Sequence, residues 1–296
     1  MEAPADVSVV IPAYNAAHLL RRCVDSVLCQ TEPVSEIIIV DDGSVDDTAK
    51  VVASLPGPIR LLRQRNLGVS VARNTGIREA RSTWIAFLDA DDRWLSNKIE
   101  RQMQCAVENT DADVIYSDAE VESESGASAG TFLTGKGPAV GWVFDRLLNS
   151  CFVLPSTVLI KRDTLVRAGM FDERLCRAED YELWLRIAAN HRFAMVPDCL
   201  TIYQRQPQSV SRDDLGMSEA IVGIFDSLAR RELTPSQRNR VQYRCSDALF
   251  DLSYAVRTID SKRALLCAWR SLRMNPMRLA TWRLAAMSFW FTVRAW

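Results

Sequence analysis

The feature that most constrains the fold is an alternation of short, unbroken apolar runs with amphipathic segments in the first 120 residues. The apolar runs are VSVVIPA (7–13), EIIIV (36–40), IRLL (59–62), WIAFL (84–88) and DVIY (113–116). Their β-branched, continuous character is typical of strands that are buried on both faces. Strands of this kind that alternate with helices indicate an α/β fold with a mostly parallel sheet covered by helices on both sides.

The segments between these strands predict helices at 16–28, 48–53, 69–80 and 96–108. Asn15 and Ser96 stand at positions suited to helix N-caps. Residues 117–140 are rich in Ser, Gly and Glu and lack periodicity, which predicts a long loop or a pair of short strands. A further strand is expected within FVLPSTVLIKR (152–162).

Composition narrows the class of protein. The chain has 296 residues, 48% of them hydrophobic and 25% charged, which fits one large domain with a smaller appendage. The net charge of −1 gives no indication of nucleic-acid binding. The N-terminus lacks the basic and apolar regions of a secretion signal. Eight cysteines without a CxxC pair, and only two histidines, argue against a zinc site and favour reduced, mostly buried thiols in the cytoplasm.

Acidic residues follow two of the predicted strands at the point where each strand ends. Asp41 and Asp42 follow the second strand, and FLDADDRW places Asp89, Asp91 and Asp92 directly after the fourth. The carboxyl ends of parallel strands meet at one edge of the sheet, where ligands bind in such folds. The two acidic clusters should therefore converge on one crevice. Solvated turns, with carboxylates that cap the next helix, are the alternative for Asp41 and Asp46.

Carboxylates packed this closely raise one another's pKa and need a cation or another partner. A hard divalent cation, Mg²⁺ or Mn²⁺, together with a phosphate-bearing substrate fits a crevice of this chemistry. Neither GxxxxGK[ST] nor GxGxxG occurs in the chain, so a P-loop or a dinucleotide cradle is not supported.

Five motifs, in this order, carry a family resemblance. They are VSVVIPAYNAAHLLRRCVDSVLCQ, EIIIVDDGSVDDT, NLGVSVARNTGIREA, WIAFLDADDRWLSNKIERQ and FDERLCRAEDYELWLRIA. Together they resemble glycosyltransferase family 2 on a GT-A fold, which is Rossmann-like, over roughly residues 6–210. The resemblance implies an inverting, metal-assisted transfer of sugar from a nucleotide-sugar, most often a UDP-sugar, to a saccharide, lipid-linked or other hydroxyl acceptor.

The resemblance also implies roles for individual residues. Asp89-Ala90-Asp91 matches the DxD motif, in which Asp91 and Asp89 would hold the metal and Asp89 and Ala90 would lie near the ribose. Asp42 would accept a hydrogen bond from the base. The remaining residues of the implied nucleotide site are Pro12, Ala13, Tyr14, Asn15 and Arg73. A surface salt bridge is the alternative for Arg73, and Asp92 is expected to cap or orient.

The implied catalytic base lies in the second half of the motif series. Glu179 and Asp180 begin an amphipathic helix, and the Asp of such a pair is the base in the family, with Glu179 orienting it or binding the acceptor. Acidic residues in a first helical turn also suit the helix dipole, which is the alternative for both. Met170 departs from the family, which commonly has a second Gly there. QxxRW, the signature of processive polysaccharide synthases, is absent, which favours single-sugar transfer in cell-surface glycan or lipid-linked saccharide assembly.

The last part of the chain, from about residue 213, is predicted to be wholly helical. The expected helices are 214–231, 235–257, 260–274 and 276–294, which gives a catalytic domain at 1–212 and a helical region at 213–296. Residues 261–296 carry seven Lys/Arg, no Asp/Glu and four of the eight tryptophans. A basic, Trp-bearing helix can lie on the inner face of a membrane, whereas dimerisation or packing on the catalytic domain are the alternatives.

Two other classes of function compete with a glycosyltransferase. A nucleotidyltransferase would need an N-terminal Gly-rich loop with a basic residue, and PAYNAAHLL has none. A non-catalytic nucleotide-sugar-binding or scaffold protein with a helical interaction region would be favoured if the base were missing, yet Asp180 is present.

Overall fold

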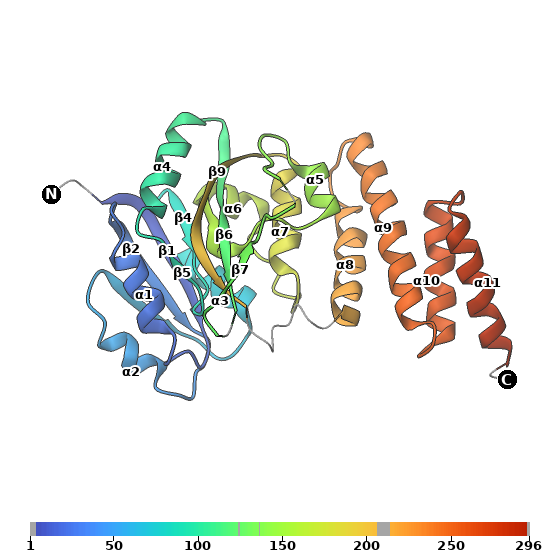
Figure 1. Ribbon diagram of the computed structural model, residues 1–296, viewed down its shortest axis with the longest axis horizontal. Helices are drawn as coiled ribbons and strands as arrows, with labels where there is room; N and C mark the ends of the chain where they lie inside the picture. Colours follow the sequence, from blue (N-terminus) through green and yellow to red (C-terminus); the bar gives the residue numbers. More distant parts are fainter. Residues whose placement is uncertain (1–3, 124, 136, 206–213, 295–296) are drawn as a thin grey trace. The chain divides into compact units, whose positions relative to one another are not determined.

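The computed structural model describes residues 4–294, apart from 124, 136 and 206–213 (Figure 1). The side chains of 290–294 also lie outside the description. The chain divides into two compact units, Met1–Pro207 and Gln208–Trp296. All eight cysteines are free thiols; three are buried, which is fewer than predicted.

The first unit is built on one sheet. Its strands are β1 (Ala5–Ala13), β2 (Val34–Asp41), β3 (Ile59–Arg63), β4 (Trp84–Phe87), β5 (Arg93–Trp94), β6 (Ala112–Glu122), β7 (Ser128–Thr131), β8 (Val158–Lys161) and β9 (Arg192–Gln204). Their order is β3-β2-β1-β4-β8-β6-β9-β5, and β7 pairs with β6. The five strands predicted in the first half are therefore all present, and residues 117–140 supply the end of β6 and the short β7.

Strand directions explain why one edge of the sheet collects the polar residues. β1 pairs in parallel with β2 and β4, and β2 pairs in parallel with β3. β8 runs antiparallel between β4 and β6, which restores the common direction for β6 and β9. The carboxyl ends of β1, β2 and β4 thus share an edge with the amino end of the reversed strand β8.

The helices of the first unit are α1 (Leu20–Leu28), α2 (Thr48–Ala53), α3 (Val69–Glu79), α4 (Lys98–Glu108), α5 (Phe144–Asn149), α6 (Arg162–Ala168) and α7 (Glu179–Ala188), with a 3₁₀ turn η1 at Pro155–Thr157. Two predicted caps are wrong. The N-cap of α1 is Leu19, because Asn15 adopts a positive φ of 50° and bonds instead to the β2–α2 loop. The N-cap of α4 is Asn97 rather than Ser96.

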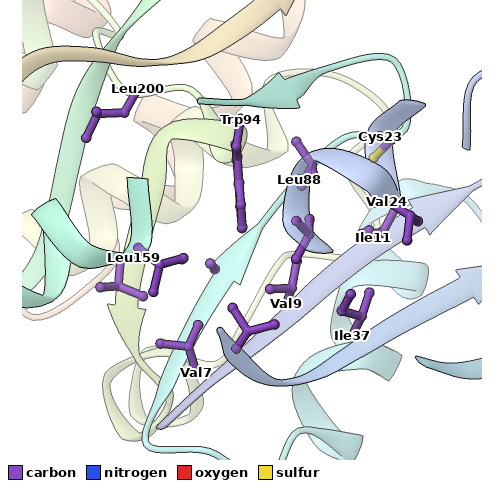
Figure 2. Close-up of a cluster of buried hydrophobic side chains, with 14 of the residues drawn as sticks. Val7, Val9, Ile11, Cys23, Val24, Ile37, Leu88, Trp94, Leu159 and Leu200 are labelled. Carbon is purple, nitrogen blue, oxygen red and sulfur yellow. The ribbon is translucent and has the colours of Figure 1, made fainter. Parts of the chain in front are cut away.

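Alternate residues of β1 face opposite sides of the sheet, and each side is covered by a helix. Val7, Val9 and Ile11 join Cys23 and Val24 of α1 in one buried cluster (Figure 2). On the other face α3 lies so close to β1 that a Cβ on Gly76 would stand 2.3 Å from Cγ1 of Val10. This close approach fixes α3, and with it the side chains that α3 presents at the edge of the sheet.

The second unit consists of α8 (Asp214–Leu228), α9 (Pro235–Val256), α10 (Ser261–Met274) and α11 (Leu279–Arg294). These boundaries lie within three residues of the predicted ones. Thr234 and Gln237 form a capping box ahead of Pro235, and Asp260 caps α10. α9 and α10 approach closely through small residues, since Ser246 and Ser271 contact each other through their hydroxyls at 3.0 Å. None of the described helices has the length and apolar content to cross a bilayer.

We predict that Gly76→Ala destabilises the protein by about 1–3 kcal/mol, because the added methyl group overpacks against Val10. Chemical denaturation measures the loss. Gly76→Ala should cost less in a Val10→Ala background, where the clashing methyl groups are gone, so a double-mutant cycle should give a favourable coupling. Strictly additive losses would show that the contact between α3 and β1 is not the cause.

Candidate active site

The loop after β1 is tied to the loop after β2. The backbone N–H of Asn15 donates to Oγ of Ser44 (2.8 Å), and Oδ1 of Asn15 accepts from the N–H of Val45 (2.9 Å). The left-handed backbone at Asn15 suits this residue type, whose short polar side chain stabilises that conformation. Ala13 is buried and Tyr14 is half exposed, so Pro12 to Asn15 form a rigid rim with one protruding ring.

Asp42 holds the loop between β3 and α3. Its carboxylate is buried and accepts hydrogen bonds from Nε2 of Gln64 (2.8 Å) and from the N–H groups of Leu67 (2.9 Å) and Gly68 (2.8 Å). A carboxylate has about four acceptor positions, so about one is left for a ligand. Asp42 therefore holds the loop that leads into α3, in addition to any contact with a base.

Arg73 of α3 joins the two acidic motifs. Its Nη2 lies 2.7 Å from Oδ1 of Asp89, and its Nη1 lies 2.8 Å from Oε1 of Glu179. The side chain is 4% exposed, which excludes the surface salt bridge considered for it. Burial alone would lower the pKa of Arg73, but the charges of Asp89 and Glu179 outweigh that effect and raise the pKa above its ordinary value. The guanidinium stays charged and brings the DxD motif beside the Glu-Asp pair.

The three carboxylates after β4 have different surroundings. Asp92 is buried, and it accepts from Oγ of Ser156 (2.5 Å) and from the N–H of Gln204 (2.9 Å). Burial, followed by the charges of Asp91 and Asp89, raises its pKa well above the ordinary range. Asp89 and Asp91 are partly exposed to solvent. The hydrogen bonds of Asp92 thus hold it inside the fold and orient the segment, whereas solvent reaches Asp89 and Asp91.

The negative charge of these three carboxylates affects the pKa of neighbouring groups. Burial and then the carboxylates at 92, 91 and 89 raise the pKa of Tyr203 to about 12. The pKa of the Cys23 thiol is raised by burial and by the same carboxylates. Excess negative charge favours a bound cation, and two partly exposed carboxylates supply the oxygen donors that Mg²⁺ or Mn²⁺ takes. The described residues hold no cluster of three ligating His, Cys, Asp or Glu, so a metal here would draw most of its ligands from substrate and water.

Asp180 lies in the first turn of α7, after a residue with unusual backbone geometry. Ala178 adopts φ 52°, ψ 29°, in the left-handed region. Burial and then the charge of Glu179 raise the pKa of Asp180 to about 7, although the charge of Arg73 opposes them. Its Oδ1 accepts from the N–H of Tyr181 (2.7 Å). The environment gives Asp180 the pKa of a proton acceptor that works near neutral pH.

Buried polar contacts hold α3 and α7 to the segment that precedes α7. Asn74 of α3 exchanges two hydrogen bonds with the backbone of Phe171, both at 2.9 Å. Arg186 of α7 pairs with Glu182 (2.6 Å) and donates to the carbonyls of Ala168 and Met170. Met170 itself has a positive φ of 57°, which explains why a Gly suits this position.

Ser156, expected from the family resemblance to face the acceptor together with Pro155 and Thr157, instead supports the DxD segment, a role that the sequence did not indicate. It lies in η1, ahead of the reversed strand β8, and is buried. Its Oγ donates to Asp92 and accepts from the N–H of Asp89 (3.0 Å), so one hydroxyl orients the DxD segment. The only signal in the sequence was its place in the Pro155-Ser156-Thr157 turn before a strand. The structure thus brings together Asp89, Asp91, Arg73, Glu179 and Asp180, while the rim residues and Asp42 line the adjoining loops.

Comparisons with known proteins identify the family of the chain. The profile described as "Glycosyl transferase family 2" matches residues 8–130. The Escherichia coli protein "UDP-Glc:alpha-D-GlcNAc-diphosphoundecaprenol beta-1,3-glucosyltransferase WfgD" is 32% identical over 193 residues, covering 64% of this chain and 72% of that protein. "Succinoglycan biosynthesis protein ExoO" of Rhizobium meliloti is 30% identical over 296 residues, covering 93% and 83%. The chain belongs to glycosyltransferase family 2.

Other relatives are longer than the matched region. An "uncharacterized glycosyltransferase" of Rickettsia felis is 34% identical over 187 residues, which are 62% of this chain but 30% of that protein. Among solved structures, residues 1–349 of TarS from S. aureus superpose with a TM-score of 0.70 at 17% identity, covering 92% of this chain and 81% of that one. The mannosyltransferase PcManGT from Pyrobaculum calidifontis gives 0.62 at 18% identity, covering 99% and 87%. These likenesses confirm the GT-A fold with C-terminal helices.

We predict that Arg73→Leu destabilises the protein by about 3–5 kcal/mol, because it leaves two carboxylates without their buried partner. The matched control is Arg78→Leu on the same helix, whose pair with Glu173 is exposed and should cost about 1 kcal/mol or less. Urea denaturation of both variants measures the difference. Equal losses would show that the Arg73 bridge does not hold the two motifs together.

Proposed function

We propose that the chain transfers a single sugar from a UDP-sugar to an acceptor hydroxyl with inversion of configuration, using Asp180 as the base. The observation that carries the proposal is Arg73, which bonds Asp89 of the DxD motif and Glu179 beside Asp180. The bridge supports a single site that contains both the proposed donor side and the proposed proton acceptor. All the residues of the proposed site lie in 1–212, which we therefore take as the catalytic domain, with 213–296 as a helical region.

UDP is the proposed nucleotide. TarS has been solved in complex with UDP and with UDP-GlcNAc, and the E. coli relative is named for UDP-Glc. PcManGT was solved with GDP-Man and Mn²⁺, so the fold accepts a second nucleotide. In the proposed complex the nucleoside lies against Pro12, Ala13, Tyr14 and Asn15, and the free acceptor position of Asp42 takes a base N–H. The ribose lies near Asp89 and Ala90.

Asp91 and Asp89 would hold Mn²⁺ or Mg²⁺, which when bound neutralises the diphosphate and stabilises the leaving group. The donor set supports this assignment, because both carboxylates are partly exposed whereas Asp92 is buried and bonded to Ser156. Oδ1 of Asp89 is paired with Arg73, so the proposed metal would share Asp89 with that arginine.

In the proposed reaction the acceptor oxygen attacks the anomeric carbon from the face opposite the nucleotide. The new C–O bond forms as the bond from the anomeric carbon to the diphosphate oxygen breaks, and the acceptor's proton passes to the carboxylate of Asp180. The pKa of about 7 supports this role, because a base is most effective when its pKa lies near the working pH. A side chain tuned in this way favours an enzyme over the scaffold alternative. Glu179 raises that pKa, and Arg73 limits the rise.

The proposed acceptor is a lipid-linked saccharide or a growing cell-surface glycan. The E. coli relative is named for a diphosphoundecaprenol-linked acceptor, and the R. meliloti relative for succinoglycan biosynthesis. The missing QxxRW motif supports one transfer per encounter rather than processive synthesis.

We predict that UDP with Mn²⁺ raises the melting temperature more than GDP, dTDP or CMP with Mn²⁺. A ligand at 100 times its dissociation constant stabilises the fold by about 2.7 kcal/mol, which a thermal-shift assay resolves. The shift should vanish on chelation, and Asp91→Asn should weaken it while Asp47→Asn, an exposed carboxylate in a surface pair, leaves it unchanged. A shift with UDP that is indifferent to metal would refute the metal role, and no shift with any nucleotide would refute the donor site.

We predict that Asp180→Asn lowers kcat by about 10²–10⁴-fold and leaves the UDP-induced thermal shift intact. Because the base must be deprotonated, kcat of the unmodified enzyme should rise with pH to a plateau, with a midpoint near 7. Glu179→Gln removes the negative charge that raises this pKa, so its midpoint should lie lower. Until the acceptor is known, hydrolysis of the donor alone can serve as the assay. Normal turnover by the Asp180→Asn enzyme would exclude this residue as the base.

A further inference from the structure

Two stripes of exposed side chains on α10 and α11 form one continuous face. Leu266, Trp269 and Arg273 follow one another at helical spacing on α10, and Leu279, Trp282, Arg283 and Phe289 do so on α11. The two stripes meet where the rings of Trp269 and Trp282 pack edge to face with centroids 6.0 Å apart. These seven residues are named here the Trp-Arg face; both helices appear in red in Figure 1.

The apolar members of this face are much more exposed than core residues. Leu279 is 75% exposed, Leu266 61%, Phe289 58% and Trp269 51%. The buried sides of the two helices are occupied by other residues, such as Ala268, Leu272 and Ala285, which pack together. The exposed side chains of the two stripes therefore do not pack the helices together, and they are available for a partner.

The charges around the face have one sign. Residues 261–296 contain seven Lys/Arg and no Asp/Glu. Three of the arginines are neutralised by acids on the preceding helices: Arg263 by Glu219, Arg270 by Asp226 and Arg278 by Asp247. Within the described part of the chain, Arg273 and Arg283 have no acidic partner, and both lie on the face next to the tryptophans.

We propose that the Trp-Arg face binds an anionic membrane surface. Tryptophans with flanking arginines are suited to the bilayer interface, where the rings enter the headgroup region and the guanidinium groups contact lipid phosphates. A second copy of the chain fits poorly, because a two-fold axis through this face would set Arg273 and Arg283 against themselves without a compensating acid. The inference does not depend on the proposed transferase activity.

The test is co-sedimentation of the full-length chain with phosphatidylcholine vesicles, with and without phosphatidylglycerol. The unmodified chain should bind only the anionic vesicles. Arg273→Gln/Arg283→Gln should weaken that binding roughly 30-fold, because each basic residue near an anionic surface contributes about 1 kcal/mol and the variant removes two. The charge-matched control is Arg81→Gln/Arg230→Gln, two exposed arginines that are not members of the Trp-Arg face, which should leave vesicle binding unchanged.

A second variant tests the apolar contribution without changing charge. Leu279→Ser/Phe289→Ser removes two exposed side chains that the fold does not need, and should reduce binding by at least about tenfold. Equal binding to neutral and anionic vesicles, no binding to either, or equal effects of the Arg273/Arg283 and control variants would overturn the proposal. So would a lipid-free dimer, seen by sedimentation velocity, that Leu279→Ser/Phe289→Ser converts to monomer. UDP-induced thermal shifts of the same variants report on the proposed function separately.

Discussion

The buried guanidinium of Arg73 is the interaction on which the rest of the candidate site depends. Two carboxylates from segments 90 residues apart in the chain, Asp89 and Glu179, would repel each other without a cation between them. Arg suits this position better than Lys, because its planar fork sends separate N–H groups to two acceptors while its charge persists under burial. The close packing of Gly76 against Val10 in turn fixes the helix that carries Arg73. Packing of α3 against the sheet thereby controls the distance between the two acidic motifs.

The same arrangement affects the pKa of Asp180, the residue next to Glu179. Arg73 is paired with Glu179, and only its longer-range charge reaches Asp180. Burial and the negative charge of Glu179 therefore dominate at Asp180 and leave its pKa about 7. A carboxyl group with that pKa loses its proton readily near neutral pH, and the resulting carboxylate can accept a proton during a reaction. Adjacent residues on one helix turn thus have different surroundings: Glu179 pairs with the arginine, whereas burial and the charge of Glu179 raise the pKa of Asp180.

Much of the architecture could be predicted because its signals are local. The apolar runs at 36–40 and 84–88 mark β2 and β4, and the C-terminal helices begin and end within three residues of the predicted positions. The reversed strand β8 and the long β9 were harder to predict, because pairing partners distant in sequence decide their direction and extent. Asn15 looked like a helix cap, but its side chain bonds to Val45, 30 residues away. Within the candidate site, sequence motifs pointed to the individual residues. The ion pairs of Arg73 and the hydrogen bonds of the Ser156 hydroxyl could be seen only in the tertiary structure.

Asp91 and Asp92 show why composition alone cannot assign roles within an acidic run. They are adjacent and chemically identical, so the string DADD gives no reason to separate them. The strand geometry turns Asp92 inward, where Ser156 and the backbone of Gln204 hold it and burial raises its pKa. Asp89 and Asp91 remain partly exposed, so a cation can reach their carboxylates from solvent while Asp92 stays bonded inside the fold.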